Sequence, residues 1–111
     1  MMTRLFGFVL VGAFAATAPA FAQGDAKLGE KLFTEQKCQM CHSIAGKGNV
    51  KGALDGVGSK LSADEIRQWI VDAPAMSAKT KAARKPAMKA YSSLSKDQVD
   101  ALVAYMQTLK K

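Results

Sequence analysis

Three segments of this 111-residue chain carry apolar residues at the spacing of an α-helix. The first covers about residues 25–36, where Leu28, Leu32 and Phe33 share one face behind Asp25, a residue suited to an N-cap. Polar residues occupy the opposite face. The pattern predicts an amphipathic helix with one buried side.

The other two predicted helices each begin with a capping box, a serine followed three residues later by Glu or Gln. Ser62 and Glu65 open the second helix, which Pro74 ends, and Ser95 and Gln98 open the third. Lysines at the end of the chain suit the C-terminal dipole of the third helix. The apolar stripes are Ile66, Trp69 and Ile70 in the second helix, and Val99, Leu102, Val103, Met106 and Leu109 in the third.

Two long connections separate these helices. Residues 43–61 are rich in glycine, and residues 73–94 contain two prolines and many small or basic side chains. Neither connection has the alternation of a sustained β-strand, although part of residues 77–85 could form a short helix. The pattern predicts an all-α fold with three main helices and long loops. Loops of this length in a small domain need something to wrap around.

The first 22 residues have the pattern of a secretory signal peptide. Arg4 precedes an apolar run from Leu5 to Ala16, and Ala20-Phe21-Ala22 forms an A-x-A cleavage site. Because this run is shorter than the about 20 residues that span a bilayer, we expect cleavage after Ala22 rather than a membrane anchor. The mature protein would be one domain of residues 23–111, exported to the periplasm.

The net charge of the chain limits the classes of partner that it could bind. Loss of Arg4 with the signal peptide leaves 15 of the 16 basic residues against 9 acidic ones, a net charge of +6. Such a chain could bind nucleic acid, anionic lipid or acidic proteins. Export and the scarcity of aromatic residues argue against nucleic acid. We therefore expect acidic protein partners; the alternative is a lysine-rich surface that only aids solubility.

A domain this small buries only about 60–65% of the surface of its unfolded chain, which makes a stable core hard to build. Small exported domains usually compensate with disulfides or a metal. The two cysteines of this chain, Cys38 and Cys41, could close only one very short loop. A large buried prosthetic group would supply the missing core.

Both cysteines and the only histidine lie in the pentapeptide CQMCH, residues 38–42. A thioredoxin-like redox pair would need neighbouring strands, a structural zinc site would need a fourth ligand, and a lone disulfide would leave His42 without a role. Covalent haem attachment uses all three residues. Cys38 and Cys41 can bond the two vinyl groups of one porphyrin, and His42 can ligate its iron. The motif predicts one covalently bound haem c.

With this motif the chain resembles the small class I c-type cytochromes over essentially the whole mature sequence. The matching features are Gly29 and Phe33, CQMCH, the stretch GALDGVGSKL with Leu54, the Trp69 helix, the heptapeptide KPAMKAY, and Tyr105 in the last helix. The resemblance implies a cytochrome c-like fold whose first and last helices cross near Gly29, Phe33 and Tyr105. It also implies that Trp69 donates its indole N–H to a haem propionate, although a plain core tryptophan remains an alternative.

The chain departs from this family after Gly52. Many relatives have a proline there, and its carbonyl accepts the Nδ1 proton of the proximal imidazole. This chain has Ala53 at that position. Because a carbonyl is still present, we expect Gly52 or Ala53 to accept the bond from His42.

The second axial ligand has to come from another residue type, since His42 is the only histidine. Methionine, lysine, water or an open position remain. Met40 lies between the cysteines, and Met106 lies on the apolar stripe of the last helix. Met76 and Met88 are left, each preceded by Pro-Ala, and Met88 lies deeper in its loop. Because KPAMKAY resembles the methionine-ligand segment of the family, we predict Met88 as the ligand, with Met76 as the alternative.

An iron ligated on both faces has no place for a substrate, so we predict a monomeric one-electron carrier and not an enzyme. Its partners would be acidic redox proteins or membrane oxidase and dehydrogenase complexes. An apolar shell around the haem would comprise Leu28, Leu32, Leu54, Val57, Trp69, Ile70 and Val99. A basic rim would comprise Lys79, Lys81, Arg84, Lys85 and Lys89 near Met88, and Lys37, Lys47 and Lys51 near CQMCH. Two alternatives stay open: an electron-transfer subunit of a larger oxidoreductase, and a haem-based small-ligand sensor.

Overall fold

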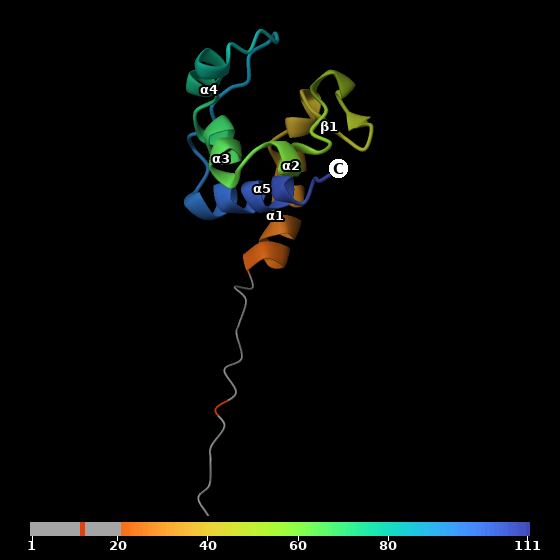
Figure 1. Cartoon of the computed structure of the whole chain (residues 1–111), viewed down its shortest axis with the longest axis vertical. Coiled ribbons are helices and arrows are strands. Elements are labelled where there is room, and N and C mark those ends of the chain that lie inside the picture. The colour runs from red at the N-terminus through yellow and green to blue at the C-terminus, as the bar shows by residue number, and fades with distance from the viewer. Residues whose placement is uncertain (1–11, 13–20) are drawn as a thin grey trace, which may run out of the picture.

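The computed structural model describes Gly12 and residues 21–111, so the predicted signal peptide, residues 1–22, lies almost entirely outside the described residues. Five α-helices supply most of the regular structure in the described part: α1 (Phe21–Glu35), α2 (Val57–Lys60), α3 (Ala63–Val71), α4 (Ala73–Thr80) and α5 (Lys96–Gln107). Two 3-10 turns, η1 (Cys38–Met40) and η2 (Val50–Gly52), and two short strands, β1 (Ser43–Ile44) and β2 (Lys47–Gly48), lie between α1 and α2. The predicted all-α architecture is confirmed (Figure 1).

Helices α1 and α5 cross and form the main helix pair of the molecule (Figure 1). At the crossing, a Cβ on Gly29 would overlap the carbonyl oxygen of Ala101 and lie 2.6 Å from Cβ of Tyr105. The rings of Phe33 and Tyr105 pack edge to face beside it, with centroids 6.1 Å apart. The predicted crossing is confirmed, and glycine is needed there because the two backbones approach too closely for any side chain.

The hydrophobic core lies where α1, α3 and α5 meet. It consists of Leu32, Phe33, Ile66, Ile70, Val99, Ala101, Leu102, Val103 and Met106. Most of these residues belong to the apolar stripes predicted from helical spacing. Each large side chain buried in this way contributes about 1.5–3 kcal/mol to the free energy of unfolding. The core therefore stabilises the part of the molecule that α1, α3 and α5 form, whereas the rest consists largely of loops.

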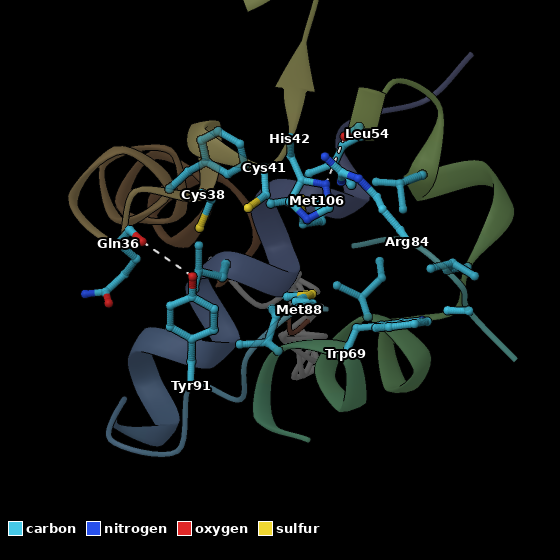
Figure 2. A pocket seen from close by; sticks show the side chains of 18 of the residues that line it. Gln36, Cys38, Cys41, His42, Leu54, Trp69, Arg84, Met88, Tyr91 and Met106 are labelled. Atoms are coloured by element: carbon cyan, nitrogen blue, oxygen red, sulfur yellow. Dashed lines mark hydrogen bonds between the residues drawn. The ribbon is translucent and has the colours of Figure 1, made fainter. Parts of the chain in front are cut away.

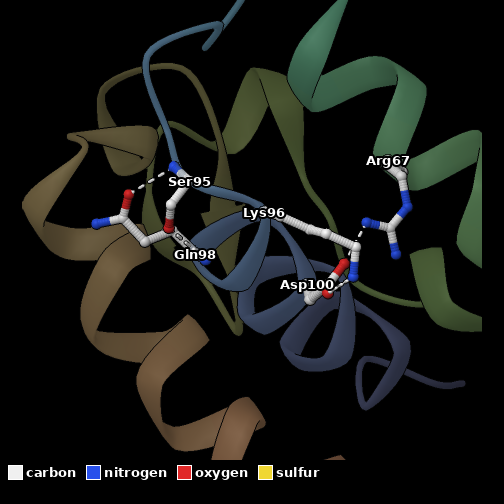
Figure 3. Close-up of polar contacts among 5 residues, drawn as sticks. All are labelled: Arg67, Ser95, Lys96, Gln98 and Asp100. Atoms are coloured by element: carbon white, nitrogen blue, oxygen red, sulfur yellow. Dashed lines mark hydrogen bonds and ion pairs between the residues drawn. The ribbon is translucent and has the colours of Figure 1, made fainter.

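The predicted capping boxes are both present. The hydroxyl of Ser62 accepts the Glu65 N–H at 3.2 Å, and the Glu65 carboxylate accepts the Ser62 N–H at 3.0 Å. Ser95 and Gln98 repeat this arrangement at 3.2 and 2.9 Å (Figure 3). These bonds satisfy N–H groups that a helix start leaves without partners. Helix α5 ends at Gln107, so Lys110 and Lys111 follow the helix and its last turn contains no basic residue.

Helix boundaries differ from the prediction at two places. Helix α1 begins at Phe21, so Asp25 lies within the helix and is not its N-cap. The second predicted helix, α3, ends at Val71, shortly before Pro74. Pro74 itself lies in the first turn of the next helix, α4, which covers part of the predicted long connection. A proline is tolerated there because the N–H it lacks would have no partner within the helix.

The glycine-rich connection contains a small hairpin that the sequence pattern did not predict. Strands β1 and β2 pair antiparallel, and two-residue strands are too short to show alternation. Gly46 and Gly48 adopt φ values of 80° and 105°, which favour glycine. After the hairpin, the N–H of Asn49 lies 3.0 Å from the Gln39 carbonyl and 3.1 Å from the His42 carbonyl. The hairpin is thereby tied to the CQMCH segment.

Candidate functional site

A cavity of about 360 Å³ lies between η1, α3 and the segment 82–91, with α5 at its base. Its walls are mainly apolar and come from parts of the chain that are far apart in sequence. The residues that line it include Cys38, Cys41, His42, Leu54, Trp69 and Met88. The fold thus brings six of the seven predicted site residues to one place (Figure 2).

The apolar wall differs in part from the predicted shell. Leu54, Val57, Trp69 and Ile70 line the cavity as expected. Leu32 and Val99 are buried in the helix core instead, and Leu28 is 41% exposed. These three residues do not line the cavity: Leu28 and Leu32 lie on α1 and Val99 lies on α5, and these two helices pack against each other. Phe33, Ile66, Leu102 and Met106 also line the cavity. The four-residue spacing of Ile66 to Ile70 and of Leu102 to Met106 could have placed these pairs on one face.

The imidazole of His42 is held by the glycine loop. Its Nδ1 lies 2.8 Å from the carbonyl oxygen of Gly52, which confirms the predicted contact and selects Gly52 over Ala53. Because a carbonyl can only accept, Nδ1 carries the hydrogen and Nε2 keeps its lone pair. Burial lowers the pKa of His42, the bond to Gly52 opposes this, and the charge of Arg84 lowers it further. The neutral ring, which is the form that ligates metals, is therefore favoured.

The two cysteines lie on a tight turn. The N–H groups of Cys41 and His42 both reach the Cys38 carbonyl, at 3.1 and 2.9 Å. Lys37, directly before the turn, adopts a left-handed conformation with φ 58°. Both cysteines are free, and burial raises the pKa of the Cys38 thiol. Figure 2 shows their sulfur atoms on the same side of the cavity. Within the described ranges, no three His, Cys, Asp or Glu residues form a group that could hold a metal, which counts against the zinc alternative.

The two candidate methionines lie in different surroundings. Met88 is half-buried on the cavity wall, and Figure 2 shows it across the cavity from His42. Met76 is only 5% exposed, but it is buried in α4 and is not one of the residues that line the cavity. Met40, between the cysteines, is 67% exposed.

Tyr91 anchors the segment that carries Met88. Its N–H donates to the Ile70 carbonyl at 2.9 Å, and its hydroxyl lies 3.5 Å from the Gln36 carbonyl (Figure 2). Both carbonyls are at helix ends, where no partner within the helix is available. The ammonium of Lys89 lies 5.0 Å from the centroid of the Tyr91 ring, a cation–π distance. Burial raises the pKa of the Tyr91 hydroxyl, and the nearby Cys38 and Cys41 raise it further.

Residues 26–110 match the cytochrome c family along nearly the whole described chain. The chain belongs to the cytochrome c family. Proteins of this family are haem-based electron carriers, and this cytochrome carries one covalently bound haem c. A cytochrome c-551 of Roseobacter denitrificans is 48% identical over 58 residues, which cover 50% of this chain and 40% of the relative. The match therefore spans less than half the length of that relative. No solved structure matches the chain.

The residues around the cavity fit a haem of this kind. The thiols of Cys38 and Cys41 lie on one side of the cavity. Next to them lies the imidazole of His42, whose Nδ1 is hydrogen-bonded to Gly52, so that Nε2 is left to ligate a metal. The remaining walls are largely apolar, as a porphyrin requires, and none of the lining residues is acidic. In the part of the cytochrome that the structure describes, no helix is long and apolar enough to cross a membrane.

Proposed function

We propose that this cytochrome is a one-electron carrier in which Cys38 and Cys41 form the thioether bonds to the haem, and His42 and Met88 ligate its iron from opposite faces. One observation carries the proposal. These four side chains, from two segments about fifty residues apart in sequence, converge on one apolar cavity, with His42 and Met88 on opposing walls (Figure 2). The arrangement needs no further ligand from the chain.

The haem supplies reversible one-electron exchange, and the protein residues set the conditions for it. The Gly52 carbonyl orients His42 and raises its basicity through the Nδ1 hydrogen bond. The neutral thioether of Met88 favours the reduced iron, which raises the reduction potential. Leu54, Trp69 and the other cavity walls exclude water. Since both faces of the iron would be occupied, the site offers no position for a substrate, which supports a carrier and not an enzyme.

The distribution of charge supports acidic partners. The chain has no acidic residue from Gln36 to Leu54 or from Ala73 to Lys96, and both stretches contribute residues to the cavity. Their lysines are Lys37, Lys47, Lys51, Lys79, Lys81, Lys85, Lys89 and Lys96. A positive surface of this kind would steer acidic redox proteins, or acidic faces of membrane oxidase and dehydrogenase complexes, toward the haem.

The place of action belongs to the same proposal. Cleavage of residues 1–22 after Ala22 would release residues 23–111 as a monomeric periplasmic domain. The arrangement A-x-A at residues 20–22 and the short apolar run before it support this. The periplasm is also a compartment in which covalent haem attachment takes place.

Visible spectra of the secreted protein test the proposal most directly. The protein is expressed in a host that attaches haem to exported chains and is recorded oxidised, reduced, and reduced under carbon monoxide. We expect a haem that stays with the denatured polypeptide and a reduced spectrum that carbon monoxide leaves unchanged, because Met88 blocks the iron. Rapid carbon monoxide binding would favour the small-ligand sensor, and stable co-elution with another protein would favour the subunit of a larger oxidoreductase. A folded but colourless secreted protein would refute the haem site itself.

A further inference from the structure

Two arginines lie among the described residues, and their surroundings differ. Arg67 pairs with Asp100 on α5. Arg84 has no carboxylate at ion-pair distance within residues 25–111. Its guanidinium lies against the backbone of the glycine loop, where a Cβ on Gly52 would overlap Nη1. Glycine at position 52 therefore makes room for the Arg84 side chain.

Arg84 also differs from the basic residues around it. It is the only lysine or arginine among the residues that line the cavity, whereas Lys81, Lys85 and Lys89 do not line it. Because Arg84 is both exposed and a lining residue, its guanidinium lies at the mouth of the cavity. Figure 2 shows the side chain reaching from the segment 82–91 toward the wall that holds His42.

The position of Arg84 relative to the cysteines is the decisive point. In Figure 2, Cys38 and Cys41 lie on one side of the cavity, and Arg84 and Trp69 lie on the other. The vinyl groups of haem are on two neighbouring pyrrole rings, and its two propionates are on the other two rings. Thioether bonds at Cys38 and Cys41 would therefore direct the carboxylates toward the side where Arg84 lies.

A carboxylate partly withdrawn from water needs a partner, because an unpaired charge there is costly. A guanidinium suits a carboxylate well, since its planar donors can form two parallel hydrogen bonds. Arg84 is the only lysine, arginine or acidic residue among the residues that line the cavity, and the neutral imidazole of His42 is assigned to the iron.

We propose that Arg84 is the counter-ion of a haem propionate and belongs to the haem site, not to the surface that binds partners. The inference rests on the proposed attachment at Cys38 and Cys41. Arg84 precedes Met88 by four residues, so the ion pair would tie the segment 82–91 to the haem edge as Tyr91 ties its other end to the helices.

Three variants of the haem-loaded cytochrome test this: Arg84→Gln removes the charge, Arg84→Lys keeps it, and Lys85→Gln removes a neighbouring charge outside the cavity. The measurement is the equilibrium of reduction against a fixed redox mediator at low and high salt. We expect Arg84→Gln to lower the equilibrium constant for reduction about fivefold. Loss of a nearby positive charge stabilises the oxidised iron, which is the more positive state, relative to the reduced iron. The shift should persist at high salt, since a direct ion pair is poorly screened. Arg84→Lys should retain most of the wild-type value, and Lys85→Gln should retain all of it at high salt.

A shift for Arg84→Gln that matches Lys85→Gln, or that disappears at high salt, would assign Arg84 to the outer surface and overturn the inference. The wild-type protein provides a second measurement that does not depend on folding of the variants. A crystal structure of the haem-loaded form should place the guanidinium within about 3.2 Å of a propionate oxygen, and a longer separation would overturn the inference as well. The same structure separates this failure from that of the proposed function, because it shows the thioether bonds and the axial ligands directly.

Discussion

Met76 and Met88 both follow the dipeptide Pro-Ala, yet the folded chain gives them different surroundings. Met76 packs inside α4 with 5% of its surface exposed. Met88 lies in an irregular segment on the cavity wall, across from His42 (Figure 2). A ligand has to reach the iron with its sulfur, and a methionine that fills a gap between helices cannot do so without leaving it. This contrast supports Met88 as the axial ligand.

Replacement of each methionine by alanine should separate the two roles. Met88→Ala should let the reduced protein bind carbon monoxide and should lower its reduction potential, because the sulfur ligand is gone. Met76→Ala should leave the spectrum unchanged and lower the free energy of unfolding by about 2–5 kcal/mol, because a buried side chain is removed. Carbon monoxide difference spectra and urea denaturation check the two variants. If Met76→Ala opened the iron and Met88→Ala did not, the assignment would be reversed.

Among the elements, the pair α1 and α5 holds the fold together (Figure 1). Their contact depends on Gly29, whose place on α1 faces the carbonyl of Ala101 and Cβ of Tyr105. In an exposed helix, Gly→Ala stabilises by about 0.5–1 kcal/mol, because alanine loses less backbone entropy on folding. At a crossing without space for a methyl group, strain should outweigh that gain.

Gly29→Ala is therefore expected to lower the free energy of unfolding by about 1–3 kcal/mol, the usual cost of overpacking. Lys27→Ala is the matched control, since Lys27 is an exposed residue of the same helix and its replacement should change stability by less than about 0.5 kcal/mol. Urea denaturation of both variants in the haem-loaded form gives the comparison. A stabilising effect of Gly29→Ala would contradict the close crossing.

Helices α3 and α5 are linked by a small ionic cluster. Asp100 accepts from Lys96 Nζ at 3.0 Å and from the guanidinium of Arg67 on α3 (Figure 3). These bonds, the one from Lys96 first, hold the pKa of Asp100 below its usual value. Exposed ion pairs contribute little to stability at neutral pH, and salt weakens them.

The direction of the pKa shift gives a pH dependence. A carboxylate with a lowered pKa in the folded state stabilises the fold above its unfolded pKa, and this contribution is lost as the pH falls through the folded pKa. The stability difference between the wild type and Asp100→Asn should therefore be largest near neutral pH and should shrink on acidification below about pH 4. Urea denaturation at several pH values measures it. Parallel pH profiles for the two proteins would show that the cluster does not contribute.

At the scale of the whole molecule, charge is distributed unevenly. Apart from Asp55, which lies just before α2, the acidic residues of the described chain lie in α1, α3 and α5 or at Asp72, which follows α3. The two acid-free stretches, in contrast, contribute residues to the cavity. The lysines of the segment 79–89 are exposed, and none of them lines the cavity. This arrangement suits long-range attraction of a negatively charged partner toward the haem edge.

Charge reversal at Lys81 and Lys85 tests this attraction. The double change to glutamate should slow electron transfer with an acidic redox protein about tenfold or more at low salt, because electrostatic steering is lost. The difference should disappear at high salt, where such charges are screened. Stopped-flow rates over a series of salt concentrations provide the measurement. Lys27→Glu with Lys31→Glu on α1 is the matched control, and an equal effect there would show that net charge, not the surface at the cavity, sets the rate.

The sequence alone determined those features that depend on neighbours along the chain. The pentapeptide CQMCH identified the cofactor class, the serine capping boxes placed two helix starts, and helical spacing identified most of the core. Each of these follows from local hydrogen bonds or from a period within one element. The hairpin of β1 and β2 cannot be predicted in this way, because strands of two residues show no periodicity. Pro74 is typical of a helix end, but here it lies in the first turn of α4.

Other features were decided only by the tertiary structure, because they depend on how segments far apart in sequence pack together. The sequence left Gly52 and Ala53 equal as partners of His42, and the fold selects Gly52. From the sequence, Arg84 is expected in the basic rim together with the lysines around it. In the folded chain, Arg84 lines the cavity and these lysines do not. Side-chain direction in an irregular segment has no periodic signal in the sequence, since it is set by contacts such as those of Tyr91 with Gln36 and Ile70.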